Sequence, residues 1–269
     1  MTLASFSAAS RVTAINRLTG LRVPPTVALA FAVIAIVIAW SLVPGLFTNH
    51  SPVIGVTAEK LLSPSAAHWF GTDHLGRDVY TRVVYGTASS VTSALIAVVI
   101  AAVAGGLIGL LAGFLGGWVD IVLARLVDVL LAIPNFLLAV IVVTAIGFDT
   151  TNAAIATGVS AVAVFARVMR SEVIKTRQAI FVEAAFLMGG SRWHILLRHV
   201  LPNASRSVLP LAVLQFGLSI LVIASLAFLG YGDPPPASDW GLLISIGKDY
   251  LKWPWLVYAP AFEIGRAHV

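Results

Sequence analysis

Long apolar runs separated by short charged stretches dominate the sequence. A helix needs about 20 apolar residues to cross the hydrocarbon core of a membrane, which is about 30 Å thick. Runs without Asp, Glu, Lys or Arg predict five membrane spans, at 25–47, within 83–119, at 129–148, at 150–166 and within 207–232. A sixth apolar run, at 253–262, has about half the required length. The pattern therefore predicts five spanning helices and the beginning of a sixth.

Composition excludes the soluble classes of protein. Of the 269 residues, 59% are hydrophobic and 11% are charged, against about 45–50% and about 25% in soluble domains. Intrinsic disorder requires the opposite balance of low hydrophobicity and high charge. The sequence contains no cysteine, which excludes disulfides, thiolate metal sites and cysteine nucleophiles. We expect an all-α, polytopic membrane helix bundle.

The charge distribution predicts the orientation in the membrane. The formal net charge is +5, and the 167–206 stretch alone carries seven basic and two acidic residues. Residues 1–22 carry three arginines and no acid. Lys and Arg concentrate in cytoplasmic loops of membrane proteins, so both regions are expected on the cytoplasmic side. A basic cluster confined to one loop between apolar spans does not indicate nucleic-acid binding.

The basic cytoplasmic loop predicts a helix-turn-helix. Residues 181–188 form a short apolar helix in this interpretation, with Glu183 near its start, where a carboxylate suits the helix dipole. Gly189-Gly190 supplies the backbone freedom that a turn requires. Ser191 can cap a second helix, which Pro202 is expected to end. Such apolar helices need a protein surface on which to pack.

The second predicted span carries a row of small residues spaced four apart. Rows of this kind allow helix backbones to approach closely in lipid. An i+4 row drifts by about 40° per step around an α-helix, so three or four members can face one partner helix. We expect tight packing, with a hinge or a pore lining as the alternatives. The row consists of Ser89, Ser93, Ala97, Ala101, Gly105, Gly109, Gly113 and Gly117.

Three motifs resemble a known family. Glu183-Ala184-Ala185, Gly189 and Leu201-Pro202 are similar to the EAA signature of bacterial ABC-importer permeases, although His199 stands where the general pattern has isoleucine. Phe-Gly-Thr-Asp-His-Leu-Gly-Arg-Asp at 70–78 resembles the C-type permease of the dipeptide, oligopeptide and nickel branch. Gly-Tyr-Gly-Asp-Pro-Pro at 230–235 and Asp-Trp-Gly at 239–241 are similar to the outer segment of that permease. The resemblance implies the type I ABC-importer permease fold.

The resemblance also implies a mechanism and partners. The chain would form the path for dipeptides, oligopeptides or nickel in a bacterial plasma membrane, together with a second permease subunit. An external binding protein would deliver the solute. Cytoplasmic ATPase subunits would bind ATP and Mg²⁺, so this chain would need no cofactor or metal and would not be an enzyme. The residues implied for ATPase coupling are Glu183, Ala184, Ala185, Gly189, Gly190, Leu201 and Pro202.

The sequence contains none of the common catalytic motifs. It has no G-x4-G-K-[ST] phosphate loop and neither H-E-x-x-H nor G-x-S-x-G. The sequence leaves two other classes of function open. An ion-coupled secondary transporter would carry acidic residues inside its spans and inverted repeats, and Asp128 is the one interior candidate. A membrane-anchored regulator would use the basic loop as a DNA-binding helix-turn-helix.

Charged residues near the spans predict ion pairs. Arg125 and Asp128 lie three apart on one helical face and are expected to pair with each other. The 72–82 segment, which is nearly neutral, is expected to be paired internally, with contact to the binding protein or the second permease as the alternative. His68 and His74 bracket Asp73, but neighbours in sequence need not converge on a metal.

The domain boundaries follow from these features. We assign 1–22 to a cytoplasmic tail, 23–82 to the first span and an external loop, and 83–262 to the permease domain, with the coupling loop at 167–206. The heptapeptide Glu-Ile-Gly-Arg-Ala-His-Val at 263–269 matches one reading frame of a sequencing adapter. We therefore expect a truncated sixth span followed by seven foreign residues; a genuine five-span chain is the alternative.

Overall fold

The computed structural model describes residues 24–268, in which the regular elements are helices together with one isolated β-bridge between Thr72 and Asp78. The chain divides into two units, 1–36 and 37–269. The first contains most of helix α2 (Pro25–Leu42). The tail expected at 1–22 lies outside the described residues. The all-α prediction is confirmed for the part of the chain that the structure describes.

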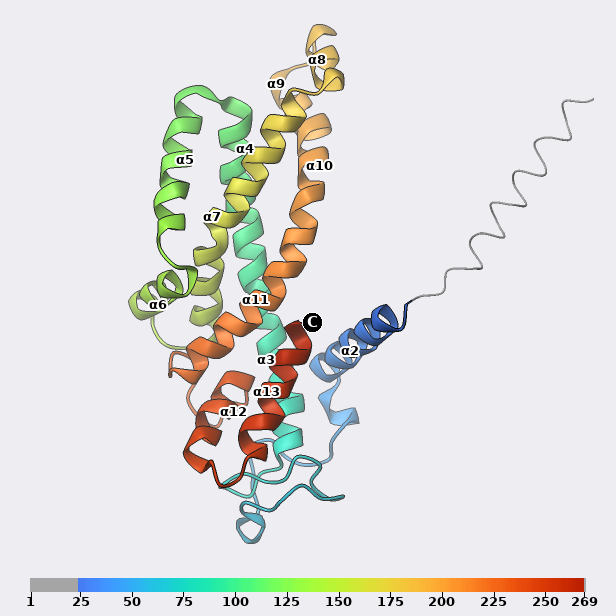
Figure 1. Cartoon of the computed structure of the whole chain (residues 1–269), viewed down its shortest axis with the longest axis vertical. Helices are drawn as coiled ribbons and strands as arrows, with labels where there is room; N and C mark the ends of the chain where they lie inside the picture. Colours follow the sequence, from blue (N-terminus) through green and yellow to red (C-terminus); the bar gives the residue numbers. More distant parts are fainter. Residues whose placement is uncertain (1–23, 269) are drawn as a thin grey trace, which may run out of the picture. The chain divides into compact units, whose positions relative to one another are not determined.

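Figure 1 shows the helices of the larger unit as a bundle. α3 (Val79–Ile100), the π-helix Ala101–Gly105 and α4 (Gly106–Leu115) form one continuous helix. The remaining long helices are α5 (Gly117–Ala132), α6 (Asn135–Ile146), α7 (Thr150–Arg177) and α11 (Val208–Phe228). The shorter ones are α8 (Ile180–Leu187), α9 (Arg192–Ile195), α10 (Leu201–Ala204), α12 (Trp240–Gly247) and α13 (Trp255–His268). A second π-helix, Leu196–Val200, joins α9 to α10, and short 3₁₀ turns lie at Pro44–Leu46, Thr57–Glu59, Ser205–Ser207 and Lys248–Tyr250.

The structure contains four or five candidate spans, against five predicted. Within the described residues, four helices are long and apolar enough to cross a membrane, and the α5–α6 pair makes a fifth span if it is counted as one. The third predicted span is not a straight helix, however, because α5 and α6 meet at an angle of 95°. The proline between them explains the break, since Pro134 has no backbone N–H to donate and forces the preceding Ile133 into an extended conformation.

The helices on both sides of the α8–α9 turn extend beyond their predicted bounds. α7 does not stop at residue 166 but continues to Arg177. Pro202 does not end the second helix, since one helical run continues from Arg192 to Phe228. The π-helix just before Pro202 shifts the hydrogen-bond register, with the N–H of Leu201 bonded to the carbonyl of Leu196. The segment that actually turns is therefore shorter than 167–206.

The row of small residues packs against α7. A Cβ added at Gly105, Gly109 or Gly113 would overlap the backbone or side chains of α7. Ala97 and Ala101 are also buried, so more of the row is covered than steady α-helical drift allows. The π-helix at Ala101–Gly105 turns less per residue than an α-helix and reverses part of the drift. The expectation of tight packing is confirmed.

Two of the clusters of buried side chains matter for the sites described below. One cluster joins Phe165 and Val173 of α7 to Val182 of α8 and Ile195 of α9. A second cluster joins Val83 and Val84 of α3 to Trp240 of α12. Figure 1 shows α8 and α9 at one end of the bundle and α12 near the other, beside the stretch that precedes α3. The two sites described below occupy these two ends.

Candidate functional site

The turn between α8 and α9 has the geometry that the glycine pair predicts. Gly189 has a φ of +84°, in the left-handed region that glycine adopts without strain. Its N–H donates to the carbonyl of Phe186, and the N–H of Gly190 donates to the carbonyl of Ala185. These two bonds form a Schellman motif, which satisfies carbonyls left free at the end of a helix. Ser191 caps α9 by accepting from the N–H of His194. The predicted helix-turn-helix is therefore present.

The predicted coupling residues do not all face the same way. Glu183 and Ala184 are exposed on α8. Ala185 points inward and packs in the cluster with Val182 and Ile195, so its small side chain serves packing within the chain. A Cβ at Gly190 would come within 2.9 Å of the Ala185 carbonyl oxygen. Gly190 therefore allows the turn to close against α8.

Leu201 and Pro202 lie apart from the turn. Both belong to α10, in the continuous helix that leads to α11. Leu201 is half-buried and packs against the same cluster as Ala185, while Pro202 is exposed. The structure does not bring either residue to the exposed face of α8 that carries Glu183.

The tip of the turn exposes large apolar side chains. Ile180, Leu187 and Met188 are each more than 80% exposed. Trp193 of α9 and Leu197 of the following π-helix are also exposed, whereas Val182 and Ile195 are fully buried beneath them. Several large apolar side chains exposed outside the predicted spans favour an interaction site. The turn is thus firmly anchored to the bundle and apolar on its outer surface.

Arg177 connects this turn to the C-terminal end of α4. Its Nη1 donates to the carbonyl of Phe114 at 3.0 Å, where a cation favours the helix C-terminus. Arg177 also lines an open hollow with Gln178, Glu183 and Leu187. Sequence analysis missed this residue, because nothing in its local pattern separates it from the other basic residues of the loop.

The predicted pair of Arg125 with Asp128 was wrong. Asp128 of α5 instead bonds Arg167 of α7 at 2.8 Å, and Asp120 bonds Arg170 through both carboxylate oxygens. Arg125 is not bonded to Asp128. The reason is tertiary: α7 passes α5 at a distance that arginine side chains can span, and a pair between helices replaces the pair within one.

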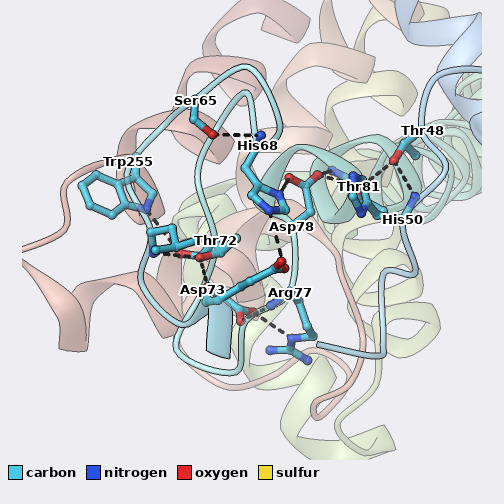
Figure 2. A network of polar contacts seen from close by, with 12 residues as sticks. Thr48, His50, Ser65, His68, Thr72, Asp73, Arg77, Asp78, Thr81 and Trp255 are labelled. Carbon is cyan, nitrogen blue, oxygen red and sulfur yellow. Dashed lines mark hydrogen bonds and ion pairs between the residues drawn. The ribbon is translucent and has the colours of Figure 1, made fainter. Parts of the chain in front are cut away.

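At the opposite end, the loop before α3, which is expected to be external, forms an internally bonded network, which Figure 2 shows. Asp73 is its centre: its Oδ1 accepts from the N–H groups of Leu75 and Arg77, and its Oδ2 accepts from the Arg77 and Arg82 guanidinium groups at 2.8 and 3.0 Å. Burial alone would raise the pKa of Asp73. The N–H of Arg77, its guanidinium charge, the N–H of Leu75 and the Arg82 charge outweigh burial and hold that pKa below its ordinary value.

Asp78 organises the start of α3. Its Oδ2 accepts from the N–H and hydroxyl of Thr81, both at 2.7 Å, and its Oδ1 lies 2.9 Å from Nδ1 of His68. His74 stacks instead on Tyr250, with the ring centroids 4.9 Å apart. No group of three or more possible metal ligands occurs in the described part of the chain. The two histidines therefore do not converge.

Arg82 links this loop to a segment more than 150 residues further along the chain. Its Nη2 donates to the Ala237 carbonyl at 2.7 Å and its Nε to Ser238 Oγ at 3.4 Å. Nε1 of Trp240 donates to the Val83 carbonyl at 3.1 Å. The structure therefore joins the segments at 70–78 and 230–241 that were noted in the sequence. Their pairing could not be read from spacing, since it depends on how α3 and α12 pack.

Comparison with known proteins supports the resemblance. Residues 105–263 match the family described as the binding-protein-dependent transport system inner membrane component. The dipeptide transport system permease protein DppC of Alkalihalophilus pseudofirmus is 37% identical over 81% of this chain and 72% of its own. The probable D,D-dipeptide permease DdpC of Escherichia coli K12 is 34% identical, over 86% and 78%. The glutathione permease GsiD of Shigella flexneri is 42% identical, over 75% and 67%.

One solved structure, an amino acid ABC transporter with histidines, is 16% identical with a TM-score of 0.49, over 70% of this chain and 91% of that one. The family match covers more than half of the chain, and the three relatives exceed 30% identity over most of it. The family match and the apolar helices both indicate a protein that crosses the membrane several times. The chain belongs to the family of inner-membrane components of binding-protein-dependent transport systems.

Proposed function

We propose that the chain is the C-type permease subunit of an ATP-driven importer of small peptides. It forms the path together with a second permease subunit. An external binding protein delivers the peptide, and cytoplasmic ATPase subunits bind ATP with Mg²⁺ and hydrolyse it. The named relatives support the substrate class, since they are named as permeases for dipeptides, D,D-dipeptides and glutathione. Nickel is the alternative cargo within the same branch.

The turn between α8 and α9 is the observation that carries the proposal. Its exposed apolar tip, formed by Ile180, Leu187 and Met188, needs a partner surface. Glu183 lies beside this tip, and within the described residues it forms no ion pair. We assign the tip to a groove on the ATPase subunit and Glu183 to a basic group at the rim of that groove.

The same turn explains how ATP binding can move the bundle. α8 packs on α7 through Val182 and Val173, and Arg177 ties the turn to the carbonyl end of α4. A force on the tip therefore reaches the longest helices directly. Only differential binding of partners to the two states can bias such a bundle. In this proposal, ATP-driven closure of the ATPase pair favours the outward-open state.

The topology follows from this assignment. The α8–α9 end and the N-terminal tail lie in the cytoplasm, and the loop preceding α3 lies outside. The basic residues around α8 and α9 favour the cytoplasmic side for that end. An ion-coupled transporter or a DNA-binding regulator would not require an ATPase at this surface, and family membership favours neither.

A charge reversal tests the proposed coupling. Glu183→Arg opposes the expected basic partner, and like charges at an interface disfavour association strongly enough to lower ATP-dependent dipeptide uptake by at least about tenfold. Glu172→Arg, a matched change on the adjacent α7, is expected to retain uptake. Both variants are assayed in proteoliposomes containing the whole complex, with insertion and subunit content measured on the same samples.

The outcomes separate the function classes. Equal uptake by the Glu183 variant and the control would contradict the coupling role of α8. Uptake that persists when the ATPase subunits are omitted would contradict the importer itself and favour an ion-coupled transporter. Binding-protein-dependent uptake of Ni²⁺ in place of the dipeptide would change the substrate class and leave the coupling mechanism intact.

A further inference from the structure

Arg82 bonds two segments that are far apart in the sequence. One is the external loop, through Asp73 Oδ2 at 3.0 Å; the other is the connection between α11 and α12, through the Ala237 carbonyl at 2.7 Å and Ser238 Oγ at 3.4 Å. Within residues 24–268, no other side chain is hydrogen-bonded to both segments. Arg82 therefore holds a unique position between them in the described structure.

The bridge is buried and geometrically specific. Arg82 is 1% exposed and Asp73 is 3% exposed, so water does not compete for these bonds. The planar guanidinium presents five donors in a fixed fork, which lets one side chain serve a carboxylate and a carbonyl on different sides. A lysine ammonium is a single point of charge on a flexible stem and cannot reproduce this fork.

The end of the connection that Arg82 holds is tightly packed. A Cβ at Gly86 of α3 would overlap the carbonyl of Ser238, and a Cβ at Gly241 would overlap the carbonyl of Ala224 in α11. The backbone at Ser238 thus touches α3, and the backbone at Gly241 touches α11. A displacement at Ala237 is therefore expected to shift α12 relative to α3 and α11.

The external loop is well placed to receive a displacement. Its outer residues Ile54 and Trp69 are 76% and 64% exposed. Internally it is rigid, because Asp73 bonds the backbone of Leu75 and Arg77, and Thr72 bonds the carbonyl of Glu59. A rigid loop transmits a push at its surface to Asp73, and Asp73 is bonded to Arg82.

We propose that Arg82 is a positioning residue that relays displacement of the external loop to the α11–α12 connection. Through it, docking of the external binding protein changes the packing of α12 on α3 and α11, which makes the bundle ready for ATP-driven opening. This inference rests on the proposed importer function, because it requires a binding protein at the outer end and an ATPase at the inner one.

Arg77 supplies a matched control. It is as buried as Arg82, at 2% exposure, and its Nε donates to the same oxygen of Asp73 at 2.8 Å. It has no hydrogen bond to the α11–α12 connection in the described structure. Replacing either arginine by lysine keeps the charge that faces Asp73, but only Arg82→Lys removes the link to Ala237 and Ser238.

The test measures ATP hydrolysis by the whole complex in proteoliposomes, with and without its binding protein loaded with dialanine. Arg82→Lys is expected to reduce the stimulation by loaded binding protein about three- to tenfold, the range by which residues between coupled sites alter coupling. Basal hydrolysis should be unchanged. Arg77→Lys should retain the stimulation of the wild type. Ser238→Ala, a small change at the weaker bond, should give a partial loss.

Each outcome decides the proposal. Full stimulation in Arg82→Lys, or equal losses in both lysine variants, would overturn the relay. Arg82→Lys could fail to assemble while Arg77→Lys assembles, which would make Arg82 a folding residue. Ser238→Ala then decides: a partial loss of stimulation in an intact complex supports the relay, and full stimulation overturns it. A wild-type complex without any stimulation would instead contradict the proposed importer function.

Discussion

Two buried carboxylates at the α12 end of the bundle differ in how many hydrogen bonds they accept. Asp73 accepts four hydrogen bonds, which together offset its burial. Asp239 is also buried and caps α12 by accepting from the N–H of Leu242 at 3.0 Å, but its Oδ2 has no hydrogen-bond partner within the described residues. Burial raises the pKa of Asp239, with Asp233 adding to the rise, while bonds from the backbone oppose it. The difference between the two carboxylates lies in the number of donors that face each one.

Asp239→Asn is expected to stabilise the protein at neutral pH. Asparagine caps helices about as well as aspartate, and the change removes a buried charge whose acceptor oxygen has no donor, at a gain of roughly 1 kcal/mol. Because the folded pKa of Asp239 is raised, its ionised form weakens the native state above that pKa, and protonation restores stability as the pH falls.

Thermal unfolding in detergent at pH values from about 4 to 8 measures this effect, because a carboxyl group with a raised pKa titrates in this range. The advantage of the asparagine variant over the wild type should shrink as the pH falls through the pKa of Asp239. A variant less stable than the wild type at pH 7, with a difference that does not depend on pH, would show that the carboxylate is favourably paired.

At the scale of elements, backbone contact between α4 and α7 holds the bundle together. The glycines of α4 allow the backbones of these helices to touch, which dispersion and weak C–H···O contacts stabilise in lipid. Two arginine–aspartate pairs add contacts between α5 and α7. Helices packed so closely are expected to move as one body.

Gly109→Ala is expected to destabilise the bundle, and Gly106→Ala is its control. A Cβ at Gly109 would overlap the Ala166 carbonyl, whereas one at Gly106 would lie 3.7 Å from Met169 Cε, an ordinary contact. Overpacking of this kind costs roughly 1–3 kcal/mol. The Gly106 variant should equal or exceed the wild type, since alanine favours helix more than glycine does. Equal thermal stability of both variants would contradict the close α4–α7 contact.

At the scale of the whole molecule, the two ends of the larger unit are held together differently. At one end, a buried apolar cluster anchors the α8–α9 turn. At the other, a buried network of ion pairs and hydrogen bonds holds the loop before α3. The arrangement also makes the orientation directly testable, because the chain contains no native cysteine.

Single cysteines should react from opposite sides of the membrane. Ile54→Cys lies in the external loop at a position that is 76% exposed, and Gln178→Cys lies beside the coupling turn. In intact cells, a membrane-impermeant maleimide should label the first and not the second. After permeabilisation, both should react. Labelling of Gln178→Cys in intact cells would reverse the proposed topology.

Local patterns in the sequence were sufficient for some features of this protein. Apolar run length predicted the spans, because the bilayer sets the length of a crossing helix. The Gly189-Gly190 pair and Ser191 predicted the turn between α8 and α9, because backbone freedom and capping act over a few residues. The EAA motif indicated the family, which the comparisons confirmed. Assignment of the seven C-terminal residues to foreign sequence stays a prediction.

Only the tertiary structure decided which distant groups meet. Asp128 pairs with Arg167 instead of Arg125 because α5 and α7 lie side by side. The π-helix before Pro202 lets a helix continue where proline alone predicts an end. Arg82 reaches Ala237 because α3 and the α11–α12 connection pack without space for a side chain at Gly86. Partners of this kind depend on the relative placement of whole helices, which no local pattern of residues encodes.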